Sequence, residues 1–158
     1  MNNIISEIES NKIDLEKKVD YHLTVSKRLN DYVSSDSLWN TLKYETGIQA
    51  VFQLMDKGIY NPNLRSGAWN SAMLSGTVNS FDFKQLNILS DIYQLQEEGP
   101  KSVWKVIAQA LVATDSYDPK NAKRLAHMLN TAFLQLHYQE KSLIDSYEYA
   151  LENLQTSN

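Results

Sequence analysis

The residues best suited to chemistry are three histidines, His22, His127 and His137, and one glutamate, Glu140. His22 lies on an apolar stripe near the N-terminus, and Glu140 interrupts a similar stripe near the C-terminus. If these stripes pair antiparallel with the chain ends level, the numbers of contacting residues sum to roughly 158, the chain length. This register places His22 near Leu136 and within about one helical turn of Glu140, so we expect the histidine and the glutamate to meet.

The expected pair of His22 and Glu140 has two interpretations. A neighbouring carboxylate raises the pKa of a histidine, so the pair can act as a buried pH-sensitive group. Alternatively, the contact only sets the register of two helices, or both side chains bend outward to water. We favour a structural role, because single buried polar residues in paired helices commonly specify alignment.

Metal binding and catalysis find little support in the sequence. His137 and Glu140 are three residues apart on one helix face, but a di-iron bundle needs Glu-x-x-His on two helices, and this chain has no such motif. His127 points away from His137 on the same helix. The chain also lacks cysteine, a Gly-x-Ser-x-Gly elbow, a phosphate-binding loop and His-Glu-x-x-His. We therefore predict no metal, no cofactor, no catalytic residue and no enzymatic activity; an enzyme whose site is hidden by sequence distance is the third alternative.

A ligand site in the middle of the chain is the second alternative. Trp69 follows a loop rich in proline, glycine and asparagine, where it can anchor a partner or plug the bundle; we favour the plug. A small-molecule or anion sensor would have a pocket near Arg65, Trp69 and Trp104. Basic residues near two expected helix starts can attract an anion, although such lysines usually extend into water; they are Lys101, Lys105, Lys120, Lys123 and Arg124.

Two long amphipathic helices must position these residues. Apolar residues recur at steps of three and four in both terminal segments, which predicts helices over about Asn3–Val33 and Pro119–Gln155. The first stripe contains Ile5, Ile8, Leu15, Val19, His22, Leu29 and Val33. The second contains Ala122, Ala126, Leu129, Phe133, Leu136, Leu143, Tyr147, Ala150 and Leu154.

The middle of the chain predicts shorter helices separated by clear breaks. We expect a helix from Asp36 to about Lys57, a loop over 59–67 and a short helix over 68–74. Ser80 is the expected N-cap of a helix that ends near Glu98 and buries Phe83 among other apolar residues. Pro100 then starts another helix, and Asp118 with Pro119 opens the last one.

These elements predict an all-α fold in one domain, residues 1–158. Residues 1–34 and 119–155 are expected to pair as a coiled-coil-like antiparallel stalk, and residues 36–115 to form a helical head. No segment alternates strictly between polar and apolar residues as a strand does.

Composition narrows the range of partners. The net charge of −4 and the pI near 5.3 argue against binding to nucleic acid, which favours a basic surplus. The N-terminus lacks the features of a signal peptide, and the most apolar stretch, Val106 to Ala113, is far shorter than the roughly 20 residues that span a bilayer. We therefore expect a cytoplasmic protein without direct membrane insertion.

Several loose motifs resemble uncharacterised soluble helical domains of bacterial proteins. They are the acidic and asparagine-containing start of the first helix (Glu7, Glu9, Asn11), Pro62-x-Leu64-x-x-x-Ala68-Trp69-x-x-Ala72, Ser75-Gly76 and Leu89-x-x-Ile92-Tyr93-x-x-Gln96. In such proteins a single membrane helix often precedes the domain. The resemblance implies no activity and no functional residues, but it adds an alternative location, as the soluble domain of a membrane-anchored protein.

Interaction is the function that this sequence favours. We predict a non-enzymatic bacterial accessory domain that binds another protein or itself, with a homodimer expected. Two paired helices bury only part of their circumference, so apolar residues outside the seam can bind a partner. The predicted interface residues are Leu23, Val25, Ile144 and Leu151.

Overall fold

The computed structural model describes residues 1–37 and 47–155, among which there is no strand. The longer helices are α1 (Asn2–Glu16), α2 (Val19–Ser34), α6 (Phe83–Glu98), α7 (Pro100–Val112) and α8 (Ala122–Gln155). The shorter elements are α4 (Gly47–Gln53), α5 (Gly67–Ser75) and the 3₁₀ turns η1 (Thr77–Ser80), η2 (Thr114–Tyr117) and η3 (Pro119–Asn121). The predicted all-α class is confirmed.

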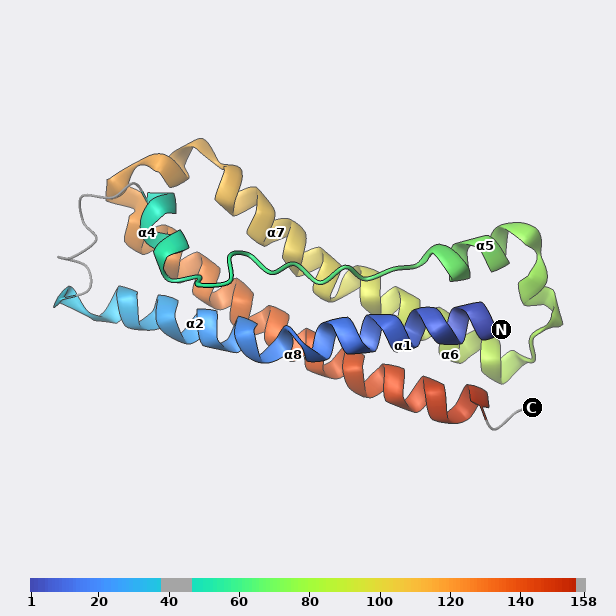
Figure 1. Cartoon of the computed structure of the whole chain (residues 1–158). Coiled ribbons are helices and arrows are strands. Elements are labelled where there is room, and N and C mark those ends of the chain that lie inside the picture. The colour runs from blue at the N-terminus through green and yellow to red at the C-terminus, as the bar shows by residue number, and fades with distance from the viewer. Residues whose placement is uncertain (38–46, 156–158) are drawn as a thin grey trace.

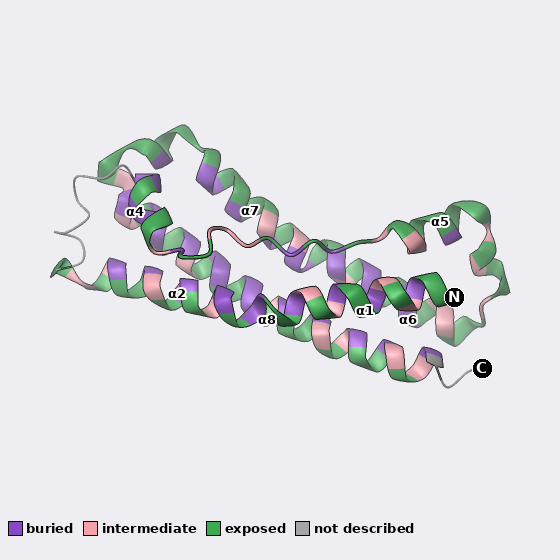
Figure 2. Ribbon diagram, viewed as in Figure 1, coloured by how far each residue is buried: buried purple, intermediate pink, exposed green. Residues whose placement is uncertain are grey.

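The N-terminal helices run antiparallel to α8, as predicted (Figure 1). Ser26 Oγ on α2 donates to Asn130 Oδ1 on α8 at 2.7 Å, and Lys12 Nζ on α1 lies 3.1 Å from Glu148 Oε1. Both contacts fall close to the register expected from the chain length. Buried side chains line the inner faces of these helices along the whole bundle (Figure 2).

The first long helix is interrupted, although we expected it to be continuous from Asn3 to Val33. α1 ends at Glu16 and α2 begins at Val19, with Lys17 and Lys18 in a turn between them. Sequence gives no warning of this break, since the turn contains neither glycine nor proline. Lys18 is buried there and its Nζ donates to the carbonyl of Asn61 at 2.9 Å. A tertiary contact thus accompanies the interruption.

The shorter middle helices pack against the terminal pair. α6 and α7 follow one another along the bundle, joined at Gly99, and both lie against α8 (Figure 1). α6 shares a core cluster with α1 and the C-terminal half of α8, whereas α7 shares another with α2, α4 and the N-terminal half of α8. The bundle therefore has three parallel or antiparallel rods, α1 with α2, α6 with α7, and α8.

Helix ends differ from the expected ones in several places. Asp82, not Ser80, caps α6: its carboxylate accepts from the backbone N–H of Gln85 at 2.8 Å, and the Gln85 side chain accepts from the Asp82 N–H, which makes a capping box. Asp118 caps the predicted turn at Pro119, but that turn is 3₁₀ and α8 starts three residues later.

The second expected helix also ends early. Within the described residues, α4 ends at Gln53 instead of near Lys57, and the first part of the predicted helix, residues 38–46, lies outside them. Turn hydrogen bonds at Leu54 and Met55 follow α4, and Met55 is buried in the core. The chain thus leaves the helix where the Met55 side chain enters the core.

Residues 54–66, which we call the strap, run along the bundle between α4 and α5 without forming a helix or strand (Figure 1). The strap begins with turns and has no regular backbone hydrogen bonds from residue 60 to residue 65, so buried polar groups there need partners from elsewhere. Side chains of the first rod supply them at steps of three and four. These side chains are Asn11, Asp14, Lys18 and Tyr21, and Glu7, four residues before Asn11, binds the start of α5 in the same way.

Side chains of the first rod bind both N–H groups and carbonyl groups of the strap. Asp14 Oδ2 accepts from the N–H of Asn63 at 2.8 Å, and the hydroxyl of Tyr21 donates to the carbonyl of Gly58 at 2.7 Å. Gly58 and Tyr60 have positive φ values of 65° and 51°, and glycine adopts this conformation without strain while tyrosine does not. The surrounding contacts therefore hold Tyr60 in a conformation that it would rarely adopt alone.

Gly47 offers a test of how α4 is seated. A Cβ atom added there would lie 2.6 Å from the carbonyl oxygen of Ser116, so Gly47→Ala must displace backbone and should lower the melting temperature, despite the higher helix propensity of alanine. Thermal unfolding followed by circular dichroism measures this. Gly67→Ala is the matched control, because its Cβ meets only Glu7 Oε2 at 3.6 Å. Equal melting temperatures for both variants would contradict the close approach.

Candidate functional site

The structure brings His22 and Glu140 together in the middle of the bundle. Their Nδ1 and Oε2 atoms are 2.7 Å apart and both side chains are completely buried. The other ring nitrogen of His22, Nε2, lies 3.2 Å from the carbonyl oxygen of Tyr60 in the strap. The histidine therefore joins α2 to α8 and to the strap at the same time.

The acceptors around His22 determine where its protons lie. A backbone carbonyl only accepts, so Nε2 carries the hydrogen in the contact with Tyr60. The short contact between Nδ1 and the Glu140 carboxyl needs one more hydrogen, carried by either partner. The pair thus holds one shared proton and carries no net charge.

Burial raises the pKa of the Glu140 carboxyl above its usual range. The hydrogen bond from His22 opposes this shift, and the charges of His137 and Lys18 oppose it less. The second oxygen, Oε1, has no hydrogen-bond partner among the described residues, so solvation of the carboxylate is incomplete. Protonation of Glu140 is therefore easier in the folded protein than in the unfolded chain.

The remaining histidines take different places. His137 is buried and its Nδ1 bonds the carbonyl oxygen of Val19 at 2.9 Å, which again joins α8 to α2. His127 is exposed. In the part of the chain that the structure describes, no three histidine, aspartate or glutamate side chains are grouped closely enough to hold a metal ion. The two buried histidines, His22 and His137, therefore both join α2 to α8.

A second buried polar cluster fixes the strap at Arg65. The side-chain amide of Asn11 donates to the Arg65 carbonyl at 2.8 Å and its oxygen accepts from the Arg65 N–H at 2.8 Å. Gln96 on α6 also donates to this carbonyl, at 3.1 Å, and Tyr147 on α8 donates to Gln96 Oε1. One residue of the strap is therefore bound by side chains that all three rods position.

Glu7 performs a related task at the start of α5. Its carboxylate accepts from the N–H of Ala68 at 2.9 Å and from that of Trp69 at 3.4 Å, and also from the hydroxyl of Tyr93 at 2.7 Å. Ser66, at the N-cap position, makes no side-chain cap bond. A carboxylate from another helix thus takes the place of a local cap and interacts favourably with the helix dipole.

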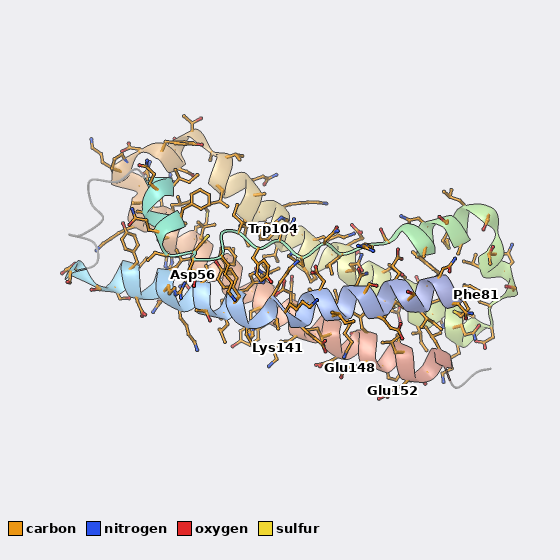
Figure 3. All side chains as sticks on the ribbon, viewed as in Figure 1. Asp56, Phe81, Trp104, Lys141, Glu148 and Glu152 are labelled. Atoms are coloured by element: carbon orange, nitrogen blue, oxygen red, sulfur yellow. The ribbon has the colours of Figure 1, made fainter. Side chains whose placement is uncertain are left out.

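The three residues predicted to form a ligand pocket lie in different places on the bundle. Trp69 stacks on Tyr93 with ring centroids 5.4 Å apart, in agreement with a role as a plug. Trp104 on α7, labelled in Figure 3, lines a pocket with residues of the strap. Arg65 lines another pocket, beside α1. The strap separates these places, because it lies between α1 and α7.

The basic residues expected near an anion also disperse. Lys101 pairs with Glu97, four residues before it, and Arg124 lies 3.3 Å from Asp115. Lys123 lies 3.5 Å from Asp36, while Lys105 and Lys120 are exposed. Three of these five basic residues thus pair with acidic side chains, which their position near a helix start does not reveal.

The predicted interface residues require a correction. Val25 is fully buried in the core, so it cannot contribute to an outer surface. Ile144 and Leu151 are half-buried against the core cluster of α1, α6 and α8, and Leu23 is half-buried. The prediction treated the terminal helices as an isolated pair, whereas α6 and α7 cover a further face of α8.

Sequence reasoning missed an apolar groove between α6 and α8. Phe83, expected in the core, is 79% exposed at one end of this groove, and Tyr149 is 56% exposed in its wall. The other lining residues are Lys84, Asn87, Ile88, Asp91, Ile92, Leu95, Ser142, Asp145 and Ser146. Phe83 fits the apolar stripe of its helix, and Tyr149 lies on the polar face of α8. Periodicity alone therefore does not reveal the groove.

Comparison with protein-family models, with curated proteins and with solved structures found no match to this chain. None of the described helices is long and apolar enough to cross a membrane. The groove and the buried polar contacts must therefore be interpreted from their own geometry.

Glu140→Gln tests the shared proton. A raised carboxyl pKa in the folded state contributes stability that is complete below the unfolded pKa, near 4.5, and is lost as pH rises through the folded value. Glutamine keeps a donor to His22 without titrating, so the stability of the wild type relative to this variant should fall as pH rises. Denaturant unfolding at a series of pH values measures this difference. Glu148→Gln, on the exposed side of α8, controls for the lost charge, and a difference that grows with pH would refute the shared proton.

Asn11→Ala tests the clamp at Arg65. The variant removes a partner from the part-buried N–H and carbonyl of Arg65 and empties a fully packed site, which should lower the free energy of unfolding by about 1–3 kcal/mol. Urea denaturation gives this value. Asn3→Ala, an exposed asparagine on the same helix, is the control and should change stability by less than about 0.5 kcal/mol. A similar small loss for Asn11→Ala would show that the clamp does not hold the strap.

Proposed function

We propose that this chain is a non-enzymatic interaction domain that associates with protein through the groove between α6 and α8. The observation that carries the proposal is the exposure of large apolar side chains there, above all Phe83. Contiguous apolar surface of this kind typically marks a site of association.

More apolar side chains are exposed at the end of the bundle where α6 begins. Leu74 and Met73 on α5 are 90% and 51% exposed, and α5 lies at the end where α6 begins (Figure 1). Aromatic and methionine side chains are enriched in protein interfaces.

The distribution of ionisable groups also favours association over catalysis. Both side chains of the pair formed by His22 and Glu140 are fully buried, so a substrate cannot reach them without opening the bundle. Glu7 and Asn11 are occupied by backbone groups of α5 and the strap. These polar groups hold the fold together. The groove is lined by aromatic and aliphatic side chains together with amide, hydroxyl and three charged ones.

Site-specific photo-crosslinking tests the proposal. A photoreactive phenylalanine analogue in place of Phe83 should form adducts with a polypeptide in cells that express the full chain, and Tyr149→Asp should abolish them. The same analogue at Tyr117, which is 54% exposed on η2 and lies outside the groove, is the control. Mass spectrometry identifies the adducts. No protein adduct at Phe83, or equal adducts at both positions, would overturn the proposal.

A further inference from the structure

We infer that the occupant of the groove is a second copy of this chain, packed antiparallel through α6; this inference rests on the proposed function. The warrant is the charge pattern of the groove. Lys84 lies near one end, and Asp91 on α6 and Asp145 on α8 lie farther along it. Such a surface is complementary to itself when a second copy is turned end over end.

The spacing on α6 sets the two-fold axis. Lys84 and Asp91 are two turns apart on one face, and their midpoint falls between Asn87 and Ile88. When two copies of α6 cross antiparallel at that midpoint, each Lys84 lies at the level of Asp91 of the other copy. Two equivalent ion pairs then flank the axis, as an isologous interface requires.

α8 supports the same arrangement. Lys84 Nζ donates to Asn153 Oδ1 at 2.8 Å, which fixes how α8 lies beside α6. One turn from Asn153, Tyr149 lies at the level of Ile88, beside the axis, where two copies of the ring can meet. Ser142 and Ser146, also in the wall, are small enough to let a second helix approach closely.

Apolar contacts complete the interface. Phe83 lies beyond Lys84 at the outer end of α6, so in the antiparallel pair it reaches the level of Ile92 in the other copy. Ile92 and Leu95 line the groove there, and Phe83 would cover them. Phe83, the most exposed aromatic side chain among the described residues, is thereby buried in both copies of the symmetric dimer.

Charge exchange tests this dimer by sedimentation velocity between about 1 and 100 μM. The wild type should be dimeric at the upper concentration, and K84D and D91K should each raise the dissociation constant at least about tenfold, because like charges then face each other. Mixing the two single variants should restore a dimer, since one now presents acids where the other presents lysines. The double variant K84D/D91K should also regain dimerisation.

Lys27→Asp, on the exposed face of α2, is the matched control and should dimerise as the wild type does. Far-ultraviolet circular dichroism shows whether each variant is folded. A monomeric wild type at 100 μM, or single variants that dimerise normally, would overturn the inference. If Phe83 nevertheless crosslinks to a different protein, the proposed function survives without the dimer; if it crosslinks to nothing, both fail.

Discussion

An extended segment inside a helical bundle must have its backbone hydrogen bonds supplied by side chains, and this requirement governs the structure. The strap covers the boundary between α1 with α2 and α7, and it cannot pair with a sheet because the described residues contain none. Unpaired buried peptide groups would cost about 1–3 kcal/mol each. Polar side chains on one face of the first rod remove this cost, from Asn11 at one end of the strap to Tyr21 at the other. This polar face is what allows the strap to lie along the bundle.

The same polar face explains why the buried polar residues resist a catalytic interpretation. His22 has a carboxyl on one side and the strap carbonyl of Tyr60 on the other, so both of its nitrogens are committed. Gln96 and Asn11 are likewise committed to Arg65. A buried polar network that is nearly complete rigidifies and specifies one arrangement. Only Glu140 Oε1 departs from this among these groups, and burial raises the pKa of that carboxyl accordingly.

Sequence patterns predicted the elements that depend on periodicity and not those that depend on tertiary partners. The stripes indicated long antiparallel terminal helices, and Pro100 and Gly76 marked real helix boundaries. The break at Lys17 and Lys18 has no local signal, because its partner Asn61 is 43 residues away from Lys18. The sequence did not reveal the polar side chains that bind the strap, for the same reason. Acidic and amide residues at steps of three and four are equally typical of a helix face exposed to water. Phe83 shows the reverse error, since an apolar side chain in register with a stripe was assigned to a core that does not reach it.

The position of the strap also accounts for where the bundle stays open. Three rods meet at three boundaries, and each must be filled by side chains, covered by another segment or left exposed. α2 packs directly on α8 over most of its length, and the strap covers the boundary between the first rod and α7. The outer boundary between α6 and α8 has no covering segment among the described residues, and there the large apolar side chains Phe83 and Tyr149 remain in contact with solvent. The groove therefore lies at a boundary that the strap does not cover. An occupant from outside the chain would cover this boundary, as residues 54–66 cover the boundary between the first rod and α7.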